Sequence, residues 1–261
     1  MSAAPAFART VRGTSGPGLL LAHGAGGGIE ANYGPVLDIL AQGRRIVGVD
    51  FPGTGGTPRA EGALEVDDLA DALVAAADAE GLDRFAVSGY SLGGSVAVRV
   101  AARYPERVTA LVLTSAFAQP DHRTRLAAEV WRELFVSGQR ELMGRFLVPL
   151  ALSPGLLEAL PPEQLEAAIR STGETAPPGT GDHADLVART DVRADLAGIA
   201  VPTLVISTTA DRLVPPALHR AVAAGIPGAR LEELATGHLP FAEAPEQWGK
   251  LITSFLDELE G

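Results

Sequence analysis

Short apolar runs alternate with longer amphipathic stretches along most of the chain. The apolar runs predict six β-strands, at residues 19–22, 45–49, 85–88, 108–113, 203–207 and 230–234. Several of these runs are continuous β-branched or leucine-rich stretches, whereas a strand with one solvent-facing side would alternate apolar and polar residues. Continuous apolar strands are expected where helices cover both faces of a parallel sheet.

The amphipathic stretches predict helices between these strands. Residues 66–80 place apolar side chains at the 3.6-residue period of a helix, and Asp67 and Asp68 stand in its first turn, where the helix dipole favours acids. Further helices are predicted at 92–103, 215–224 and 245–259. Strands and helices that alternate with short connections predict an α/β fold, in which helices flank a mostly parallel, twisted sheet.

The alternation stops after Leu113 and resumes at Val201. Between these points the sequence has no strand pattern and consists of leucine- and alanine-rich helical pieces separated by prolines. We therefore predict a core made of residues 1–116 and 195–261, and a helical lid insertion at residues 117–194. The expected place of this lid is over the carboxyl edge of the sheet, where ligands bind in such folds.

Composition and charge narrow the possible classes of protein. The 261 residues, 46% of them hydrophobic, suit one large α/β domain with an insertion. No apolar run approaches the roughly 18 residues of a membrane span, and no secretory signal pattern opens the chain, so we expect a cytoplasmic protein without a membrane partner. The absence of cysteine excludes disulfides and thiolate chemistry, and a net charge of −11 argues against nucleic-acid binding.

A candidate nucleophile lies in the segment Gly89-Tyr-Ser91-Leu-Gly93, directly between the predicted strand 85–88 and the predicted helix 92–103. A sharp strand-to-helix turn leaves no room for a side chain on either flank of the serine, and glycine stands at both flanking positions. Such a turn lifts the Ser91 hydroxyl out of the sheet, near helix N–H groups that favour developing negative charge. The placement therefore predicts a nucleophilic serine.

Serine needs a base that an acid orients. His238 follows the last predicted strand in a glycine-containing loop, and Asp211 follows the strand before it. The resulting order Ser91, Asp211, His238 is typical of this kind of serine turn. Some proteins of this build carry the acid after an earlier strand, where the first acid here is Asp121; we favour Asp211.

The other four histidines have structural interpretations. His219 falls within a predicted helix and is expected at its surface. His122 and His183 lie in the insertion, where we expect solvated side chains. His23 opens the glycine-rich loop after the first predicted strand of the parallel sheet.

The glycine-rich loop 23–28 is a candidate for oxyanion stabilisation. The backbone N–H of Leu92, directly after the serine, and that of Ala25 in the loop are the expected donors. A dinucleotide-binding loop is the rival interpretation, but the spacing that begins Gly24-x-Gly26 requires a third glycine at position 29, which is Ile29. No Gly-Lys-Ser/Thr loop or metal-ligand cluster is visible, so we expect no cofactor and no metal.

Taken together, these motifs resemble the α/β-hydrolase superfamily. They are the loop 23–28, the segment Asp50-Phe-Pro-Gly-Thr-Gly55, the segment 89–93, Asp211 and the pair Gly237-His238. From about residue 8 to residue 258 the chain is similar to the lid-bearing esterase, lactonase and cofactor-free haloperoxidase branch. The resemblance implies a structural role for His23.

The same resemblance narrows the chemistry. Ser91 stands where haloalkane dehalogenases and epoxide hydrolases carry aspartate, and Leu239 follows His238 where carbon–carbon bond hydrolases usually carry an aromatic residue. We therefore predict a serine hydrolase that cleaves an ester, thioester or lactone of a small molecule with a mostly apolar acyl or alkyl part. The residues expected to bind substrate are Tyr90, Trp131, Phe135 and Leu239. The alternatives are a non-hydrolytic enzyme with the same triad (a perhydrolase, lyase or cyclase) and a non-catalytic binding protein.

Overall fold

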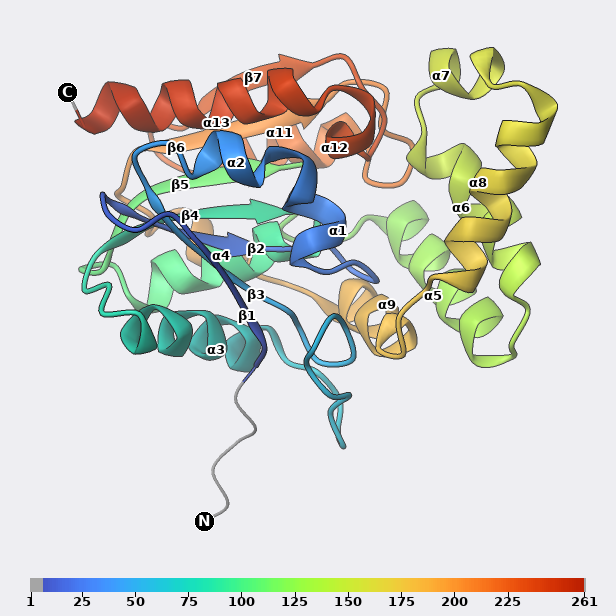
Figure 1. The fold of residues 1–261 in the computed structure, drawn as a ribbon, viewed down its shortest axis with the longest axis horizontal. Coiled ribbons are helices and arrows are strands. Elements are labelled where there is room, and N and C mark those ends of the chain that lie inside the picture. The colour runs from blue at the N-terminus through green and yellow to red at the C-terminus, as the bar shows by residue number, and fades with distance from the viewer. Residues whose placement is uncertain (1–6, 261) are drawn as a thin grey trace.

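A computed structural model describes residues 7–260. It contains a seven-stranded sheet in the order β1-β3-β2-β4-β5-β6-β7 (Figure 1). The strands are β1 (Arg9–Arg12), β2 (Gly18–Ala22), β3 (Arg45–Val49), β4 (Phe85–Tyr90), β5 (Val108–Thr114), β6 (Thr203–Thr208) and β7 (Arg230–Leu234). Strands β2 to β7 pair in parallel, and β1 pairs antiparallel with β3. The predicted α/β class and all six predicted strands are confirmed.

Strand β1 is absent from the sequence-based prediction. It is a four-residue edge strand, Arg9-Thr-Val-Arg12, with both arginines exposed and the two middle residues only partly buried. An edge strand needs no apolar run because one of its long sides has no partner strand, and charged residues there discourage pairing with other chains. Apolar patterning therefore could not identify it.

Alternate residues of the central strands point to opposite faces and build two cores. Leu20 and Val47 face one core, and Leu19 and Ile46 face the other. The first core is covered by α3 (Val66–Ala79), α4 (Leu92–Arg103), α10 (Arg193–Leu196) and α11 (Pro216–Gly225). The second is covered by α1 (Ile29–Tyr33), η1 (Gly34–Val36), α2 (Leu37–Leu40) and α13 (Pro245–Glu260), and the short α12 (Pro240–Glu243) precedes α13. Both faces of the sheet are thus covered, which explains the continuous apolar strands.

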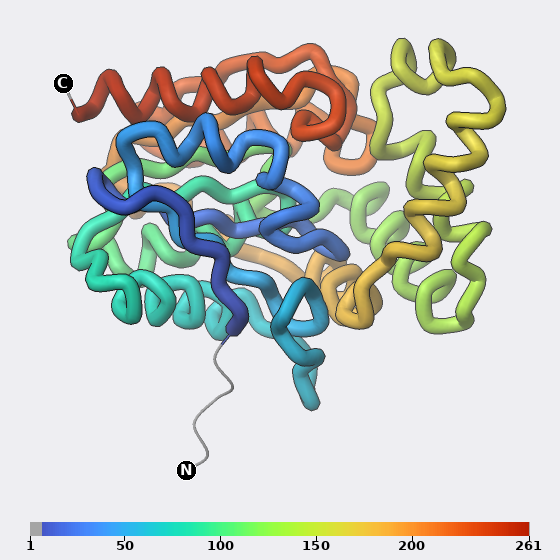
Figure 2. Tube along the Cα trace, in the orientation of Figure 1, coloured from blue at the N-terminus to red at the C-terminus, as the bar shows by residue number. Residues whose placement is uncertain are grey.

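The segment between β5 and β6 consists of helices joined by loops and contains no strand. Its helices before α10 are α5 (His122–Val136), α6 (Arg140–Ala151), α7 (Pro154–Ala159), α8 (Pro162–Glu174) and α9 (Thr180–Arg189). They stand beyond the carboxyl ends of the parallel strands, at the right of Figure 1, and Figure 2 shows the chain leaving the sheet for this region and returning to it. The insertion therefore lies over the edge at which ligands bind in α/β sheets.

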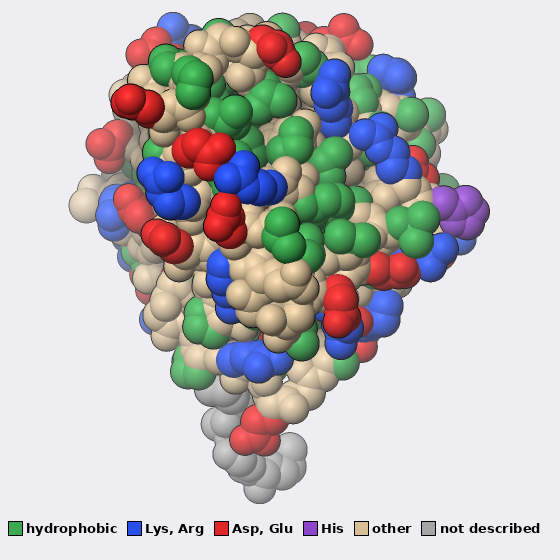
Figure 3. Space-filling model, turned by 90° about the vertical axis from the view of Figure 1, so that its right-hand side faces the viewer, with side chains coloured by type: hydrophobic (Ala, Val, Ile, Leu, Met, Phe, Trp, Pro, Cys, Tyr) green, Lys and Arg blue, Asp and Glu red, His purple; other side chains and the backbone are tan. Residues whose placement is uncertain are grey.

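The outer face of the insertion carries several exposed apolar side chains. Figure 3 looks onto this side of the molecule and shows hydrophobic groups among charged ones. The large exposed residues here are Leu126, Val130 and Val136 of α5 and Leu142 of α6. Among residues 7–260, no helix is both long enough and apolar enough to cross a bilayer.

Candidate active site

The serine turn has the geometry that its sequence predicts. Ser91 joins β4 to α4 with φ 54°, a left-handed conformation that residues other than glycine rarely adopt. A Cβ atom on Gly89 would overlap the carbonyl oxygen of Gly93, and one on Gly93 would overlap the carbonyl oxygen of Ala22. Glycine at both positions therefore lets β4, α4 and the end of β2 pack closely enough to form the turn.

Ser91, His238 and Asp211 form one hydrogen-bonded chain. His238 Nε2 lies 3.0 Å from Ser91 Oγ, and His238 Nδ1 lies 2.6 Å from Asp211 Oδ2. The other carboxylate oxygen, Asp211 Oδ1, accepts the N–H groups of Leu213 and Val214, each at 2.9 Å. Because Asp211 accepts at both oxygens, its carboxylate has a fixed orientation, and Nδ1 of His238 is left as the donor in their hydrogen bond.

Two hydroxyl groups extend this chain behind the aspartate. Thr208 Oγ1 donates to Asp211 Oδ2 at 3.1 Å and lies 2.9 Å from Ser115 Oγ. Since the single hydroxyl proton of Thr208 is used toward Asp211, Ser115 is the donor in the second bond. Asp121, the alternative acid from the sequence, takes no part in this chain. It is exposed and caps α5 by accepting the Thr124 N–H at 2.7 Å.

The His238 loop is held by the core on one side and by the insertion on the other. Tyr90 donates its hydroxyl to the carbonyl oxygen of His238 at 2.9 Å, and the His238 N–H donates to the carbonyl oxygen of Ala151 at 2.7 Å. Burial, followed by the nearby charge of Asp211, raises the pKa of Tyr90 well above 10, so the phenol keeps its proton at neutral pH. The imidazole is therefore positioned from two elements that are far apart in the sequence.

Glu243 links the same loop to the insertion a second time. Its Oε1 atom accepts the N–H of Gly237 at 3.1 Å and the N–H of Ser153 at 2.9 Å. Hydrogen bonds to a charged acceptor are stronger than neutral ones, so Glu243 holds the His238 loop and the insertion together. The sequence-based analysis missed this residue, because nothing in the local pattern pairs position 243 with position 153.

The two expected oxyanion donors lie where no protein group competes for them. Leu92 is the first residue of α4, and Ala25 lies in the loop between β2 and α1. Among residues 7–260 neither N–H donates to another protein group. The loop itself is fixed on both sides of Ala25, because the Gly24 N–H donates to Asn32 Oδ1 at 3.0 Å and the Gly26 N–H donates to His183 Nδ1 at 3.1 Å.

The expectation of a solvated His183 is wrong. This side chain of α9 is fully buried, accepts the Gly26 N–H at Nδ1, and donates from Nε2 to the carbonyl oxygen of Pro52 at 3.0 Å. His183 thus connects the insertion to two loops of the core. Position in a helical insertion indicated exposure, but the inner face of α9 packs on those loops. His122, at the start of α5, is exposed as expected.

The expectation of a surface position for His219 is also wrong. His219 is fully buried beneath the sheet, with Nδ1 3.2 Å from Ser207 Oγ and Nε2 3.8 Å from Asp211 Oδ2. It shares the inward face of α11 with Val222, three residues further on. That spacing is the helical period and could have indicated burial.

His23 is buried as a neutral side chain between two loops. Its Nδ1 donates to the carbonyl oxygen of Gly24 at 2.8 Å, and its Nε2 accepts the Phe51 N–H at 2.8 Å. Both ring nitrogens are therefore engaged in holding loops. The contacts agree with a structural role.

Three buried histidines are expected to lower folding stability as the pH falls below about 6.5. Burial lowers the pKa of His183 and of His219 to about 4; for His23, burial together with the neighbouring His183 lowers it to about 3. All three are neutral in the folded protein, whereas in the unfolded chain they bind protons near pH 6.5. The unfolded state then binds more protons between pH 6.5 and about 4. As the pH falls through this window, each histidine removes about 1.4 kcal/mol of unfolding free energy per pH unit. Above pH 6.5 it removes none.

Urea unfolding at fixed ionic strength between pH 7 and pH 4.5 measures this effect. His219→Gln should reduce the slope by the share of one histidine, and the matched change His122→Gln at the exposed position should leave the slope unchanged. Stability that stays constant or rises as the pH falls through this range would contradict the expectation.

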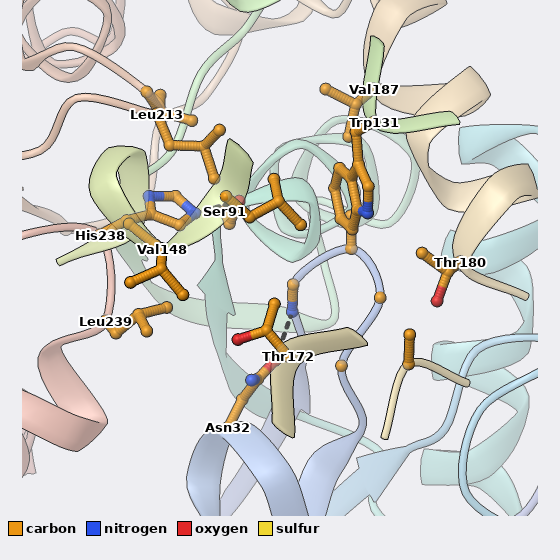
Figure 4. Close-up of a pocket in the computed structure, with 18 of the residues that line it drawn as sticks. Asn32, Ser91, Trp131, Val148, Thr172, Thr180, Val187, Leu213, His238 and Leu239 are labelled. Carbon is orange, nitrogen blue, oxygen red and sulfur yellow. Dashed lines mark hydrogen bonds between the residues drawn. The ribbon is translucent and has the colours of Figure 1, made fainter. Parts of the chain in front are cut away.

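A cavity of about 420 Å³ opens over Ser91, between the carboxyl ends of the strands and the insertion. Ala25, Ser91 and His238 line it from the core, and α5, α6, α8 and α9 supply its other walls (Figure 4). Most of the lining is apolar. The cavity lining includes Trp131, Met143, Leu147, Val148, Val187, Leu213 and Leu239.

Three of the four expected substrate-binding residues lie at this cavity: Tyr90, Trp131 and Leu239. The expectation for Phe135 is wrong, because this residue does not line the cavity. Its ring packs against the Arg140 guanidinium, whose carbon lies 3.6 Å from the ring centroid. The polar lining residues Asn32 and Thr172 were not expected from the sequence. Among residues 7–260, no three His, Asp or Glu side chains are grouped so that they could hold a metal ion.

The sheet order, its helical layers and the serine turn are those of α/β hydrolases. The sequence model of the alpha/beta hydrolase fold matches residues 17–245, and the chain belongs to this family. The sequence-based assignment to the superfamily is confirmed.

Named relatives are hydrolases. The chain is 35% identical over 243 residues to pyrrolizixenacetamide deacetylase of Xenorhabdus hominickii, with 92% of this chain and 91% of the relative covered. It is 31% identical over 249 residues to a pimeloyl-[acyl-carrier protein] methyl ester esterase of Aromatoleum aromaticum, with 90% and 96% covered. A solved thermophilic esterase of Thermogutta terrifontis superposes with a TM-score of 0.83 at 26% identity, with 100% of this chain and 97% of that chain covered. The chain is therefore a hydrolase of the α/β fold.

Proposed function

We propose that this hydrolase cleaves a carboxylic ester, thioester or lactone of a small molecule with a mostly apolar acyl or alkyl part, through an acyl-enzyme on Ser91. The observation that carries the proposal is the hydrogen-bonded chain from Asp211 through His238 to Ser91 at the floor of an apolar cavity. The helical insertion serves as the lid of that cavity, since Trp131 of α5 and Leu147 of α6 are part of its wall.

In the first half of the reaction, Ser91 Oγ attacks the substrate carbonyl carbon while its proton passes to His238 Nε2. The new C–O bond pushes the carbonyl electrons onto oxygen, and the N–H groups of Leu92 and Ala25 stabilise this oxyanion. Asp211 holds the imidazole and stabilises its charged form. The tetrahedral intermediate then collapses, and the leaving group takes the proton from His238.

In the second half, His238 removes a proton from water, and the resulting oxygen nucleophile attacks the acyl carbon. Collapse of the second tetrahedral intermediate breaks the bond to Ser91 Oγ. His238 returns the proton to Ser91, so the enzyme is regenerated and the product is a carboxylic acid.

Amide hydrolysis is a second candidate. It is favoured by the deacetylase relative, which is 35% identical to this chain. The same residues suffice for this reaction, because His238 is placed to protonate an amine leaving group. The apolar cavity would then hold the amide of a neutral, largely apolar molecule.

Labelling with a fluorophosphonate tests the proposed nucleophile. We expect intact-mass measurement to show one adduct on the wild-type protein and none on Ser91→Ala. A folded wild-type protein that is not labelled would contradict an activated serine. For any ester, thioester, lactone or amide that is turned over, reaction in oxygen-18-labelled water should place one heavy oxygen in the acid product; its absence would point to a non-hydrolytic outcome.

A further inference from the structure

The cavity over Ser91 is lined without acidic or basic side chains, apart from the histidine of the proposed triad. Among the described residues that line it, none is Asp, Glu, Lys or Arg. A buried charge on a ligand costs several kcal/mol unless a counter-charge or several hydrogen bonds compensate for it. The part of the substrate that occupies this cavity is therefore neutral.

The Asn32 side chain in this lining has a free hydrogen-bond donor. Asn32 is 7% exposed, and its Oδ1 atom accepts the Gly24 N–H at 3.0 Å. Because a backbone N–H can only donate, this bond fixes which end of the amide is oxygen and leaves Nδ2 on the other side. Among residues 7–260, Nδ2 has no protein acceptor. Figure 4 shows the fixed amide at the cavity wall, with Thr172 beside it in this view.

Two neighbouring polar groups are not available as donors to a ligand. The Thr172 hydroxyl donates to the carbonyl oxygen of Ala168 at 2.8 Å, so its proton is already used. Trp131 Nε1 also lacks a partner, but it is sealed from solvent and cannot reach a ligand. Unlike Trp131 Nε1, Asn32 Nδ2 keeps accessible surface, so a ligand oxygen that enters the cavity can accept a hydrogen bond from it.

The position of Asn32 indicates which part of the substrate it meets. The leaving group must lie beside His238, which protonates it. Asn32 is bonded instead to Gly24, the residue before the proposed oxyanion donor Ala25, and Figure 4 shows it apart from His238. The acyl part, which extends away from the leaving group, is therefore the part that reaches Asn32.

We propose that Asn32 Nδ2 is a specificity-determining donor for a neutral acceptor oxygen, such as a ketone or amide carbonyl, in the acyl part of the substrate. This inference rests on the proposed function, because the attack by Ser91 defines which part is the acyl part. It narrows the substrate class from apolar esters to neutral esters whose acyl chain carries a second carbonyl oxygen.

The test compares methyl hexanoate with methyl 4-oxohexanoate and methyl 5-oxohexanoate. The wild-type protein should prefer at least one oxo ester in kcat/KM by about threefold to tenfold, the usual range for one neutral hydrogen bond. Asn32→Asp keeps an oxygen that accepts the Gly24 N–H but replaces the donor with an acceptor, so the preference should vanish or reverse. Asn32→Ser removes the amide without adding charge and should also abolish the preference. Thr172→Val, whose hydroxyl proton is already used, is the matched control and should keep it.

Binding separates failure of the subsite from failure of the proposed function. Calorimetry with Ser91→Ala measures the affinity for the same three esters without turnover, alone and combined with Asn32→Asp. A wild type that cleaves the plain ester and both oxo esters equally well overturns the role of Asn32 while the hydrolase function stands. A wild type that cleaves none of them, while Ser91→Ala binds an oxo ester threefold to tenfold more tightly through Asn32, leaves the subsite standing and contradicts ester hydrolysis.

Discussion

Ser91→Ala is expected to lower kcat by roughly 10⁴-fold to 10⁶-fold on any ester that the wild-type protein cleaves. Alanine removes the only atom that forms the covalent bond to the acyl group and leaves the cavity and both backbone donors in place. KM should therefore change little. The measurement is steady-state kinetics on the purified variant, with circular dichroism to show that it folds.

Ser95→Ala is the matched control for this variant. Ser95 lies one turn further along α4, is fully buried, and donates its hydroxyl to the carbonyl oxygen of Phe117 at 2.6 Å. Its loss should reduce stability by about 1 kcal/mol and leave kcat close to the wild-type value. If Ser91→Ala retained most of the activity, the acyl-enzyme mechanism would be wrong.

Asp211→Asn is expected to lower kcat by roughly 10³-fold to 10⁴-fold, less than Ser91→Ala, because the mutated group orients the base and does not react. The reason lies in how this carboxylate is held. One oxygen must keep accepting the N–H groups of Leu213 and Val214, so the new amide turns its NH₂ group toward His238. Nδ1 of the imidazole then becomes the acceptor, and the proton moves to Nε2. In that form His238 cannot accept the proton of Ser91.

The pH dependence of kcat/KM, measured with the wild type and Asp211→Asn, checks this explanation. Asp191→Asn, on an exposed carboxylate that binds Arg193, is a control with the same change of atoms and should be neutral for activity. A loss of less than tenfold in Asp211→Asn would show that the aspartate does not select the form of the imidazole.

The three residues of the hydrogen-bonded chain could be selected from the sequence because each follows a strand that is recognisable locally. Glycines beside Ser91 report a steric requirement that is met within a few residues. Asp211 and His238 stand just after β6 and β7, and the carboxyl ends of parallel strands meet at one edge of a sheet. Local patterning and one rule of topology therefore sufficed to place them together.

The side chains that hold the surrounding loops in place could not be selected in this way. His183 and Glu243 act through hydrogen bonds to loops at Pro52 and Ser153, more than 80 positions away along the chain. Trp131 and Phe135 are both aromatic residues in the apolar pattern of the insertion, yet only Trp131 lines the cavity. The turn of α5 that faces the core depends on how the insertion packs, and apolar periodicity alone does not define that packing.

The sequence by itself determined six of the seven strands and the helices that alternate with them, the α/β class, the serine turn and the candidates for its base and acid. These follow from periodicity and sterics between near neighbours in the chain. The tertiary structure alone decided that His219 and His183 are buried, that β1 forms one edge of the sheet, and that Asn32 presents a donor to the cavity. Whether a side chain is buried, and whether its donor has a partner, depends on which distant segments pack together. That packing involves many side chains at once, and no local sequence pattern reports it.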